Sequence, residues 1–224
     1  MEKNRKISLV TLKNNEKLVL KVVSKEEGKI ASLLKTIDYM YLANIFSVCD
    51  VGEECLIAEE FVLGYSLDYI LRKKEYEFTI NEILMIGIQM CKALNRLHKT
   101  TPPVIHGDIK PENIILCSRN PILVKLIDCD DGVVWDQYGV YRNTKGTYGF
   151  CAPEQRDGKM IDTSTDIYGL GKTLEFLLYG SKGHILKKRH LKRIIKKGTA
   201  QNQKDRFVTV TEFQKELETI LYGC

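Results

Sequence analysis

The hydrophobic pattern of the chain changes once, near Gly64, and this change limits the folds that the 224 residues can adopt. Before Gly64, short runs rich in Val, Leu and Ile alternate with turn sequences, which is typical of β-strands. KISLVTL and KLVLKVV flank the turn sequence KNNE and predict a hairpin, while NIFSVCDVGEECLIAEEFV predicts two further strands. One short helix, KEEGKIASLLKTI, is expected between the two strand pairs. Residues 1–62 are therefore predicted to be mostly β.

The rest of the chain has mainly helical periodicity. SLDYILRKK predicts one helix, and TINEILMIGIQMCKALNRLHK predicts a longer one that begins with a T-x-x-E capping box of Thr79 and Glu82. Two prolines in TTPPV end that helix. Two short strands are expected at NIIL and LVKLID, followed by an irregular stretch from Cys129 to about Lys159, and such long loops in compact domains are usually functional. STDIYGLGKTLEFLLYG, ending at Gly180, and TVTEFQKELETILYG predict two more helices.

Composition and charge restrict the class of protein. A content of 44% hydrophobic and 28% charged residues is typical of a globular fold and not of a disordered chain. The net charge of +5 is modest, and much of it lies in LKKRHLKRIIKKG, where the basic residues of Lys187–Lys197 alternate with apolar ones at helical spacing. A solvated surface helix is the simplest interpretation, and a site for an acidic substrate or partner is the alternative. We expect no nucleic-acid partner, because no nucleic-acid-binding motif accompanies the basic helix.

The cysteines and the apolar runs indicate a cellular location. The seven cysteines are scattered singly without a C-x-x-C pair, so we expect reduced thiols and no zinc site. The N-terminal MEKNRKISLV has no long apolar region after its charges, so we expect no signal peptide. The run ILMIGIQMC is too short to cross a bilayer. The prediction is a soluble, cytoplasmic protein without a membrane segment.

Polar residues interrupt the apolar stretch VIHGDIKPENIIL in a pattern that suits phosphate chemistry. Asp108 follows an apolar run, Asn113 comes five residues later, and Asp128 ends the predicted strand LVKLID. Loops at strand ends commonly display functional groups, and oxygen donors of this kind suit Mg²⁺. Lys110 adds a cation, so the parts that phosphoryl transfer needs are all present. Each residue alone is more often a cap or turn residue, but the combination is much rarer by chance.

The stretches HGDIKPENIIL, VKLIDCD, GTYGFCAPEQ, DIYGLGKTLEFLLYG and DRF resemble the ordered signatures of eukaryotic-type Ser/Thr protein kinases, a family that includes bacterial members. The resemblance begins at about Ile7 and covers most of the chain. It implies an α+β fold of two lobes, in which residues 1–224 form one kinase domain with a small, truncated β-rich N-lobe (1–62) and a helical C-lobe (63–224). ATP and Mg²⁺, with Mn²⁺ as an alternative, would lie in the cleft between the lobes, near Gly64.

The resemblance implies catalytic roles for residues that match its motifs. Asp108 would accept the proton of the substrate hydroxyl, and Lys110 would neutralise charge on the transferred phosphoryl group and mark a preference for Ser and Thr. Asn113 and Asp128 would hold the metal ion. Thr147 would hydrogen-bond toward Asp108 and Lys110.

Further roles concern the nucleotide and the support of the site. Lys21 would bind the α- and β-phosphates of ATP, and the backbone of Glu60, Phe61 and Val62 would meet adenine at the hinge. Four residues would support the catalytic and activation segments. Glu154 would form an ion pair with Arg206, Asp166 would lie beneath the catalytic loop, and His106 would add structural support.

The chain departs from the kinase pattern around the nucleotide. No G-x-G-x-x-G precedes Lys21, so we expect ATP to be less enclosed and bound more weakly. Ile30 stands where the family places a helix glutamate, and two acidic residues are alternatives. Glu27 would serve if the short helix shifted, and Glu59, just before the hinge, could reach Lys21 from behind the adenine pocket unless it points elsewhere.

Further departures concern the metal motif and the activation segment. Cys129 replaces the phenylalanine of D-F-G, and Asp130 replaces its glycine; we expect Asp130 to be a turn residue in preference to a carboxylate near the metal. Gly107 stands where many kinases carry an arginine that contacts a phosphate, so activity should not need phosphorylation of Thr144, a position for autophosphorylation in the activation loop. The segment after Gly180 is too short for the usual docking helix, which the basic helix would partly replace.

The predicted function is ATP-dependent transfer of the γ-phosphoryl group to Ser or Thr hydroxyls of protein substrates. A pseudokinase that binds nucleotide or protein as a regulatory scaffold is the alternative. A small-molecule phosphotransferase is a third interpretation, and the combination of K-P-E-N with A-P-E disfavours it.

Overall fold

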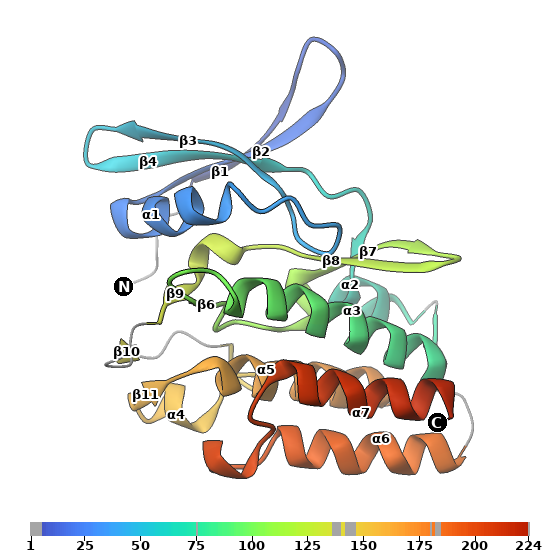
Figure 1. Cartoon of the computed structure of the whole chain (residues 1–224). Coiled ribbons are helices and arrows are strands. Elements are labelled where there is room, and N and C mark those ends of the chain that lie inside the picture. Colours follow the sequence, from blue (N-terminus) through green and yellow to red (C-terminus); the bar gives the residue numbers. More distant parts are fainter. Residues whose placement is uncertain are drawn as a thin grey trace.

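The computed structural model describes residues 6–74, 76–135, 140–141, 147–179, 181 and 185–223. An antiparallel sheet with one helix forms the first part, and a mainly helical part lies beneath it (Figure 1). The α+β fold of the sequence prediction is therefore correct. Among the described residues, no helix is both long and apolar enough to cross a bilayer.

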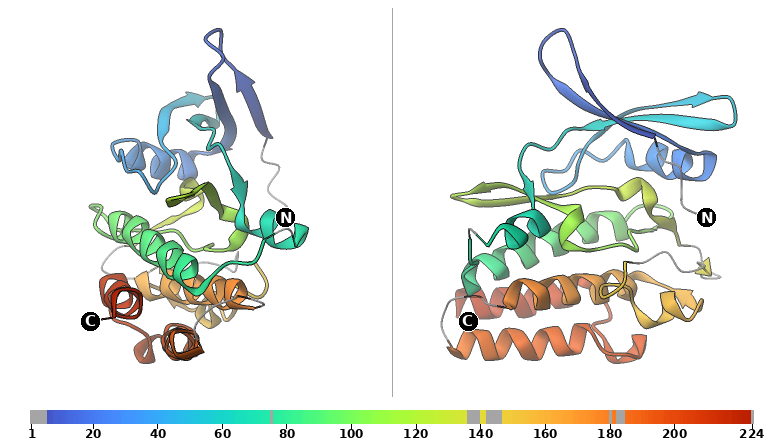
Figure 2. Two further views of the ribbon diagram at one scale, coloured as in Figure 1. Left: turned by 90° about the vertical axis from the view of Figure 1, so that its right-hand side faces the viewer. Right: turned by 180° about the vertical axis from the view of Figure 1, so that it is seen from behind.

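The first sheet contains the strands β1 (Lys6–Thr11), β2 (Lys17–Ser24), β3 (Ile45–Val51) and β4 (Glu54–Glu60), in the order β1-β2-β4-β3. All neighbours are antiparallel, and the β1–β2 hairpin extends well beyond the other strands (Figure 2). Helix α1 (Lys25–Leu34) follows β2 directly, and Ser24 with Glu27 forms its capping box. The predicted hairpins and helix are confirmed.

The helical part contains α2 (Leu67–Lys73), α3 (Ile80–His98), α4 (Pro153–Arg156), α5 (Thr163–Leu178), α6 (Ile185–Gly198) and α7 (Val210–Tyr222). Helix α3 packs against α5 and α7, and α6 packs against the same two helices. The capping box of Thr79 and Glu82 is present. Helix α5 ends at Leu178, two residues before the expected end, and Gly180 itself lies outside the described residues.

The second part also contains short strands. β5 (Tyr65–Ser66), β7 (Ile114–Arg119) and β8 (Ile122–Leu126) form one sheet in the order β5-β7-β8. β6 (Val104–Ile105) pairs with β9 (Val133–Val134), and β10 (Val140–Tyr141) pairs with β11 (Met160–Ile161). The stretch predicted to be irregular thus contains only short elements, and residues 136–139 and 142–146 within it lie outside the described residues.

Gly64 lies where the chain crosses from the first sheet to β5. Its φ of +149° is rarely adopted by other residues. A Cβ atom at Gly64 would collide with the carbonyl oxygen of Leu116 and lie 2.9 Å from Cγ2 of Ile115. The crossing therefore depends on direct contact between the backbone and β7, which only glycine permits.

We predict that Gly64→Ala destabilises the fold by at least about 3 kcal/mol, because overpacking and an unfavourable φ each cost about 1–3 kcal/mol. Gly52→Ala is the matched control, since Gly52 also has a positive φ of +60° but nothing lies within 4 Å of its Cβ position. This control should lose only about 1–2 kcal/mol. Urea unfolding compares the two, and equal losses would show that the contact with β7 is unimportant.

Candidate functional site

The segment between β6 and β7 is held in place by Asp166, in the first turn of α5. The Asp166 carboxylate accepts hydrogen bonds from the backbone N–H groups of His106 (2.9 Å) and Gly107 (2.7 Å) and contacts Nε2 of His98 at 2.8 Å. Burial opposes ionisation of Asp166, but these contacts outweigh it and hold its pKa below the usual value. His106 is also buried, with Nε2 3.0 Å from the carbonyl oxygen of Ile127. The expected support from beneath the loop is therefore present.

The backbone conformation at position 107 explains why a glycine stands there, which the resemblance to kinase motifs did not explain. Its φ is +73°, in the left-handed region, so a glycine fits there without strain. Its carbonyl oxygen accepts a hydrogen bond of 2.7 Å from Nε2 of the buried Gln155. Gln155 and His98 were both missed from the sequence, because a glutamine after A-P-E and a histidine at a helix end carry no signal of their own.

Asp108, Lys110 and Thr147 form a closed triangle of contacts. Nζ of Lys110 lies 2.7 Å from Oδ2 of Asp108 and donates to Oγ1 of Thr147 at 2.7 Å. Oγ1 of Thr147 in turn donates to Oδ1 of Asp108 at 3.0 Å. All three side chains remain partly accessible to solvent. A carboxylate is thus fixed beside a cation and remains open to solvent, so that a hydroxyl group can approach it.

Asn113 and Asp128 lie at adjacent ends of the β7–β8 hairpin. The N–H of Ile127 donates to the carbonyl oxygen of Asn113 at 3.0 Å, so the residues just before β7 and just after β8 are neighbours. Nδ2 of Asn113 donates to the carbonyl oxygen of Asp108 at 3.0 Å and links this end of the hairpin to the segment between β6 and β7. Asp128 has a φ of +60°, an uncommon conformation that is often found at functional sites.

The acidic partner of Lys21 is Glu59, as the second of the two alternatives proposed. Lys21 faces Ile57 across the β2–β4 ladder, and Glu59 lies two residues further along β4, on the same face of the sheet. The two side chains form a buried ion pair. The other alternative, Glu27, directs Oε2 of its carboxylate into the capping box, where it accepts hydrogen bonds of 2.8 Å from the N–H and the hydroxyl of Ser24.

Asp130 was expected to be only a turn residue, and the structure gives it a further role. It does occupy a 3₁₀ turn, Cys129–Asp131, but it is not merely a turn residue. The turn directs its side chain back into the interior, where Oδ1 lies 2.8 Å from Nζ of Lys21 and the residue is almost fully buried. Oδ1 of Asp128 lies 2.7 Å from the same ammonium group. Lys21 is therefore surrounded by three carboxylates.

This acidic cluster, Glu59, Asp128 and Asp130, has the properties of a cation site. One oxygen from each carboxylate lies within 4.8 Å of the others. Burial opposes the charged form of Lys21, but the three carboxylates outweigh it and raise its pKa. Burial also raises the pKa of Glu59 to about 7, although Lys21 acts in the opposite direction. Three acids facing one lysine leave negative charge uncompensated, and an all-oxygen donor set suits Mg²⁺ or Mn²⁺, so the residues fit a divalent cation.

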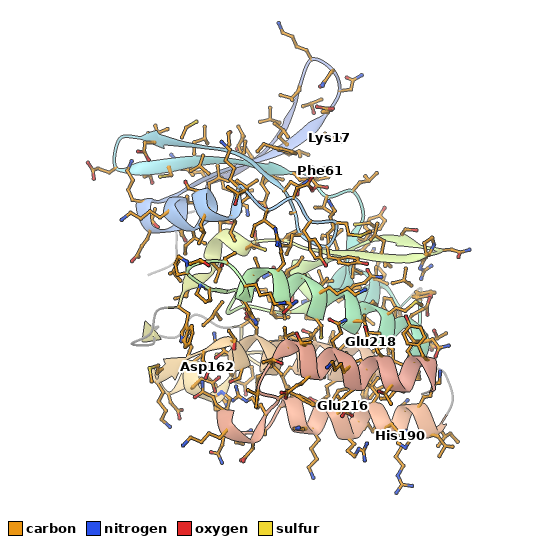
Figure 3. The ribbon with its side chains drawn as sticks, in the orientation of Figure 1. Lys17, Phe61, Asp162, His190, Glu216 and Glu218 are labelled. Atoms are coloured by element: carbon orange, nitrogen blue, oxygen red, sulfur yellow. The ribbon has the colours of Figure 1, made fainter. Side chains whose placement is uncertain are left out.

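A pocket of ≈ 260 Å³ opens beside the cluster. Its walls are mainly apolar, and its inner end is charged; it is lined by Ile7, Val19, Lys21, Glu59, Glu60, Phe61, Val62, Ile115, Ile127 and Asp128. Nζ of Lys17 lies 5.6 Å from the ring centroid of Phe61 (Figure 3). The Glu60 carboxylate binds Nζ of Lys125 at 2.6 Å, so its side chain is engaged by β8. A mainly apolar pocket that also contains a lysine and carboxylates suits adenine with its phosphates.

Glu154 and Arg206 form a buried, bidentate ion pair. Nη1 and Nη2 of Arg206 lie 2.6 and 2.7 Å from the two carboxylate oxygens of Glu154. Oγ1 of Thr165 donates to the same carboxylate at 2.9 Å. Because both charges are paired and hydrogen-bonded, they can be buried at little cost. The pair ties α4 to the segment that precedes α7.

We predict that Glu59 makes the stability of the metal-free protein depend on pH. Its folded-state pKa of about 7 lies above its ordinary value of 4.5, so the unfolded chain releases the proton first, and stability falls as pH rises between these values. Urea unfolding in EDTA should show wild type losing about 3 kcal/mol relative to Glu59→Gln between about pH 4.5 and pH 8. Parallel pH curves for the two proteins would contradict the prediction.

Comparisons with known proteins agree with the geometry. The family described as protein kinase domain matches residues 6–224. A probable serine/threonine-protein kinase of Clostridium perfringens is 32% identical over 176 residues, covering 75% of this chain and 23% of that protein. A probable serine/threonine-protein kinase of Arabidopsis thaliana is 32% identical over 158 residues, covering 66% of this chain and 40% of that protein.

A third relative, a probable serine/threonine-protein kinase of Dictyostelium discoideum, is 29% identical over 159 residues, which is 69% of this chain and 15% of that protein. The chain thus spans well under half the length of each of these three relatives. The family match extends over nearly the whole sequence and includes both the sheet and the helical part. The chain therefore belongs to the protein kinase domain family.

Proposed function

We propose that the chain is an ATP-dependent Ser/Thr protein kinase domain that transfers the γ-phosphoryl group to protein hydroxyls. The observation that supports this most strongly is the triangle of Asp108, Lys110 and Thr147. It places a proton acceptor beside a cation, which is the arrangement that transfer to a hydroxyl group needs.

Each member of the triangle has a separate role in this proposal. Asp108 orients the substrate hydroxyl and accepts its proton as the oxygen attacks phosphorus. Lys110 faces the same oxygen and compensates the negative charge that gathers on the transferred group. Thr147 hydrogen-bonds to both side chains and fixes their separation. Asp166 acts only through the backbone of His106 and Gly107, so it is a positioning residue.

The nucleotide would occupy the pocket beside the acidic cluster. The backbone of the hinge, Glu60–Val62, meets adenine, and Lys21 holds the α- and β-phosphates. Asn113 and Asp128 hold Mg²⁺, with Mn²⁺ as the alternative, and Asp130 adds a further carboxylate. When bound, the metal ion supplies charge neutralisation for the phosphates. Ile7 and Val19 cover the pocket from β1 and β2, where no glycine-rich loop precedes Lys21.

We also propose that helix α6 favours acidic protein partners. Lys188, Lys192 and Lys196 recur every four residues and line a hollow of ≈ 530 Å³ against α5. His190 lies on the outer side of the same helix (Figure 3). A row of lysines along a hollow attracts carboxylates. This surface would take over part of the substrate binding for which other kinases use an extra helix.

We predict that Asp108→Asn lowers phosphoryl transfer at least about a hundredfold, the usual contribution of a general base. The assay measures labelled γ-phosphate entering the protein itself or a generic Ser/Thr substrate with Mg²⁺. Asp38→Asn, at an exposed acid outside the site, is the matched control and should keep full activity. A thermal shift with Mg-ATP should persist in Asp108→Asn. No transfer by wild type above the Asp108→Asn background would instead support the pseudokinase alternative.

We predict that Thr144→Ala keeps wild-type activity, whereas Thr147→Ala loses most of it. Position 107 is a glycine and offers no guanidinium to a phosphate on Thr144, which lies outside the described residues. Thr147, by contrast, contacts both Asp108 and Lys110. The same transfer assay tests both alanine variants, and an inactive Thr144→Ala would overturn the view that activity needs no phosphate there.

A further inference from the structure

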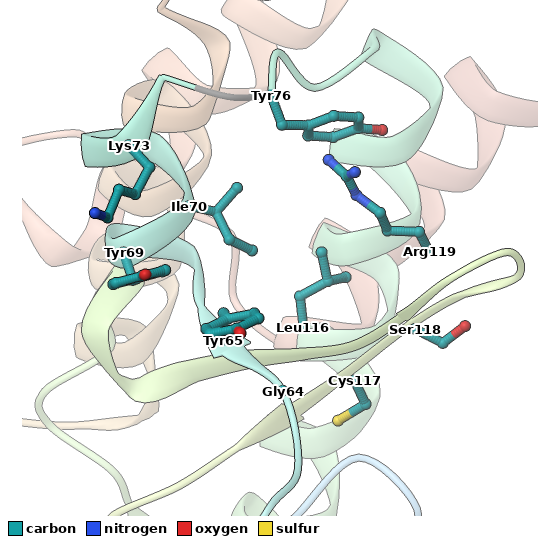
Figure 4. Close-up of a pocket in the computed structure, with 10 residues that line it drawn as sticks. All are labelled: Gly64, Tyr65, Tyr69, Ile70, Lys73, Tyr76, Leu116, Cys117, Ser118 and Arg119. Carbon is teal, nitrogen blue, oxygen red and sulfur yellow. The ribbon is translucent and has the colours of Figure 1, made fainter.

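A second pocket, of ≈ 580 Å³, lies between α2 and β7 (Figure 4). Ile115 lines the nucleotide pocket, and the next four residues of β7, Leu116 to Arg119, line this one. Three tyrosines, Tyr65, Tyr69 and Tyr76, form much of its wall, and we call it the tyrosine pocket. None of the residues proposed to act on ATP or on the substrate hydroxyl lines it.

The tyrosine pocket exposes an unusual amount of aromatic surface. Tyr65 is 63% exposed and Tyr69 46%, although their rings stack on one another with centroids 5.0 Å apart. Ile70 and Leu116 give the pocket an apolar floor (Figure 4). Clustered tyrosines above an apolar floor are typical of the centres of protein interfaces, since their rings contribute much area at little entropic cost. The pocket therefore suits a large apolar or aromatic side chain.

Two cations flank the opening from opposite sides. The guanidinium of Arg119 stacks on Tyr76, 3.1 Å from its ring centroid, and Nζ of Lys73 lies 5.6 Å from the ring centroid of Tyr69 (Figure 4). None of the ten residues that line the pocket is acidic. Within the described part of the chain, no carboxylate is within ion-pair distance of Lys73. Glu82 accepts a hydrogen bond from the Tyr76 hydroxyl and lies within electrostatic reach of Arg119. Among the described residues, it is therefore Lys73 that gives the rim a positive charge without a carboxylate paired to it.

We propose that the tyrosine pocket is a docking site for an acidic protein segment that carries one large apolar side chain. The apolar side chain enters between the tyrosines and Leu116, and carboxylates on either side of it meet Lys73 and Arg119. Charge complementarity favours an acidic segment over a basic one, because like charges at the rim would repel it. The proposal concerns binding alone, so it stands or falls separately from phosphoryl transfer.

Binding to the whole chain is measured by fluorescence anisotropy with three fluorescein-labelled peptides. The probe is GSDEFDEGS, GSDEADEGS lacks the aromatic side chain, and GSKKFKKGS reverses the charge. Lys73→Glu combined with Arg119→Glu should weaken binding of the probe at least about tenfold, and Tyr69→Ala should do so without changing charge. The control pair Lys13→Glu and Lys29→Glu makes the same change in net charge at exposed sites elsewhere and should leave binding unchanged.

Several results would overturn the proposal. The probe could fail to bind wild type at about 1 mM, a concentration at which even weak docking is detectable. It could bind no better than GSDEADEGS or GSKKFKKGS. It could lose affinity equally in the control pair, which would indicate a general charge effect. Finally, it could lose affinity only when Lys188, Lys192 and Lys196 are changed to Glu, which would place the acidic segment on α6. Thermal unfolding of each variant checks that the fold is retained.

Discussion

The ammonium group of Lys21 connects the two parts of the fold. Lys21 is 2% exposed and lies on β2, yet two of its three carboxylate partners, Asp128 and Asp130, follow β8 in the helical part. A charge buried this deeply is tolerable only when it is paired, and the removal of one partner of a buried pair typically costs about 3–5 kcal/mol. These ion pairs therefore link the position of the first sheet to the charges of the site. A ligand or cation that changes the net charge around Lys21 would also change the interaction between the two parts.

Because Glu59 on β4 pairs with Lys21, helix α1 does not have to supply the glutamate for this pair. In the kinases that the sequence resembles, a helix glutamate meets the lysine, so movement of that helix makes or breaks the pair. Here the partner lies on β4, in the same sheet as Lys21, and its position is fixed by the strand register. The face of α1 that carries Ile30, Ala31 and Leu34 is buried instead. Gly28 lets the helix approach β4 closely, because a Cβ there would collide with Cys55. Apolar packing thus positions α1, and Glu59 reaches Lys21 from within the sheet.

The sequence predicted well whatever depends on local patterns. The hairpins and the capping box of Thr79 and Glu82 follow from turn residues and helix periodicity, which act over a few residues. The triangle around Asp108 was implied by the resemblance to kinase motifs, because Thr147 is far from Asp108 in the sequence. It predicted less well what depends on register or on the path of a turn. Glu59 could be offered only as one of two alternatives, because a one-residue slip would turn it to the other face of the sheet. Asp130 was misjudged, because its sequence neighbours indicate a turn and nothing in them shows which way the carboxylate points. The tyrosine pocket had no signal, since Tyr76 and Arg119 are far apart in the sequence and meet only in the folded chain.

The two pockets are separated by one strand and one glycine. Phe61 and Val62 line the nucleotide pocket, and Gly64 and Tyr65 line the tyrosine pocket, so a single short segment forms a wall of both. That segment has little freedom, because Gly64 lies directly against the carbonyl of Leu116 and Tyr65 pairs with Leu116 in the sheet. A ligand that contacts Tyr65 would therefore contact a backbone segment that is held tightly against β7 at Gly64 and Tyr65. Close-packed contacts of this kind transmit displacement instead of absorbing it. If an occupant of the tyrosine pocket shifted Tyr65 and this shift reached the backbone of Phe61 and Val62, a nucleotide bound in the first pocket would, by reciprocity, change the affinity for that occupant in the same sense.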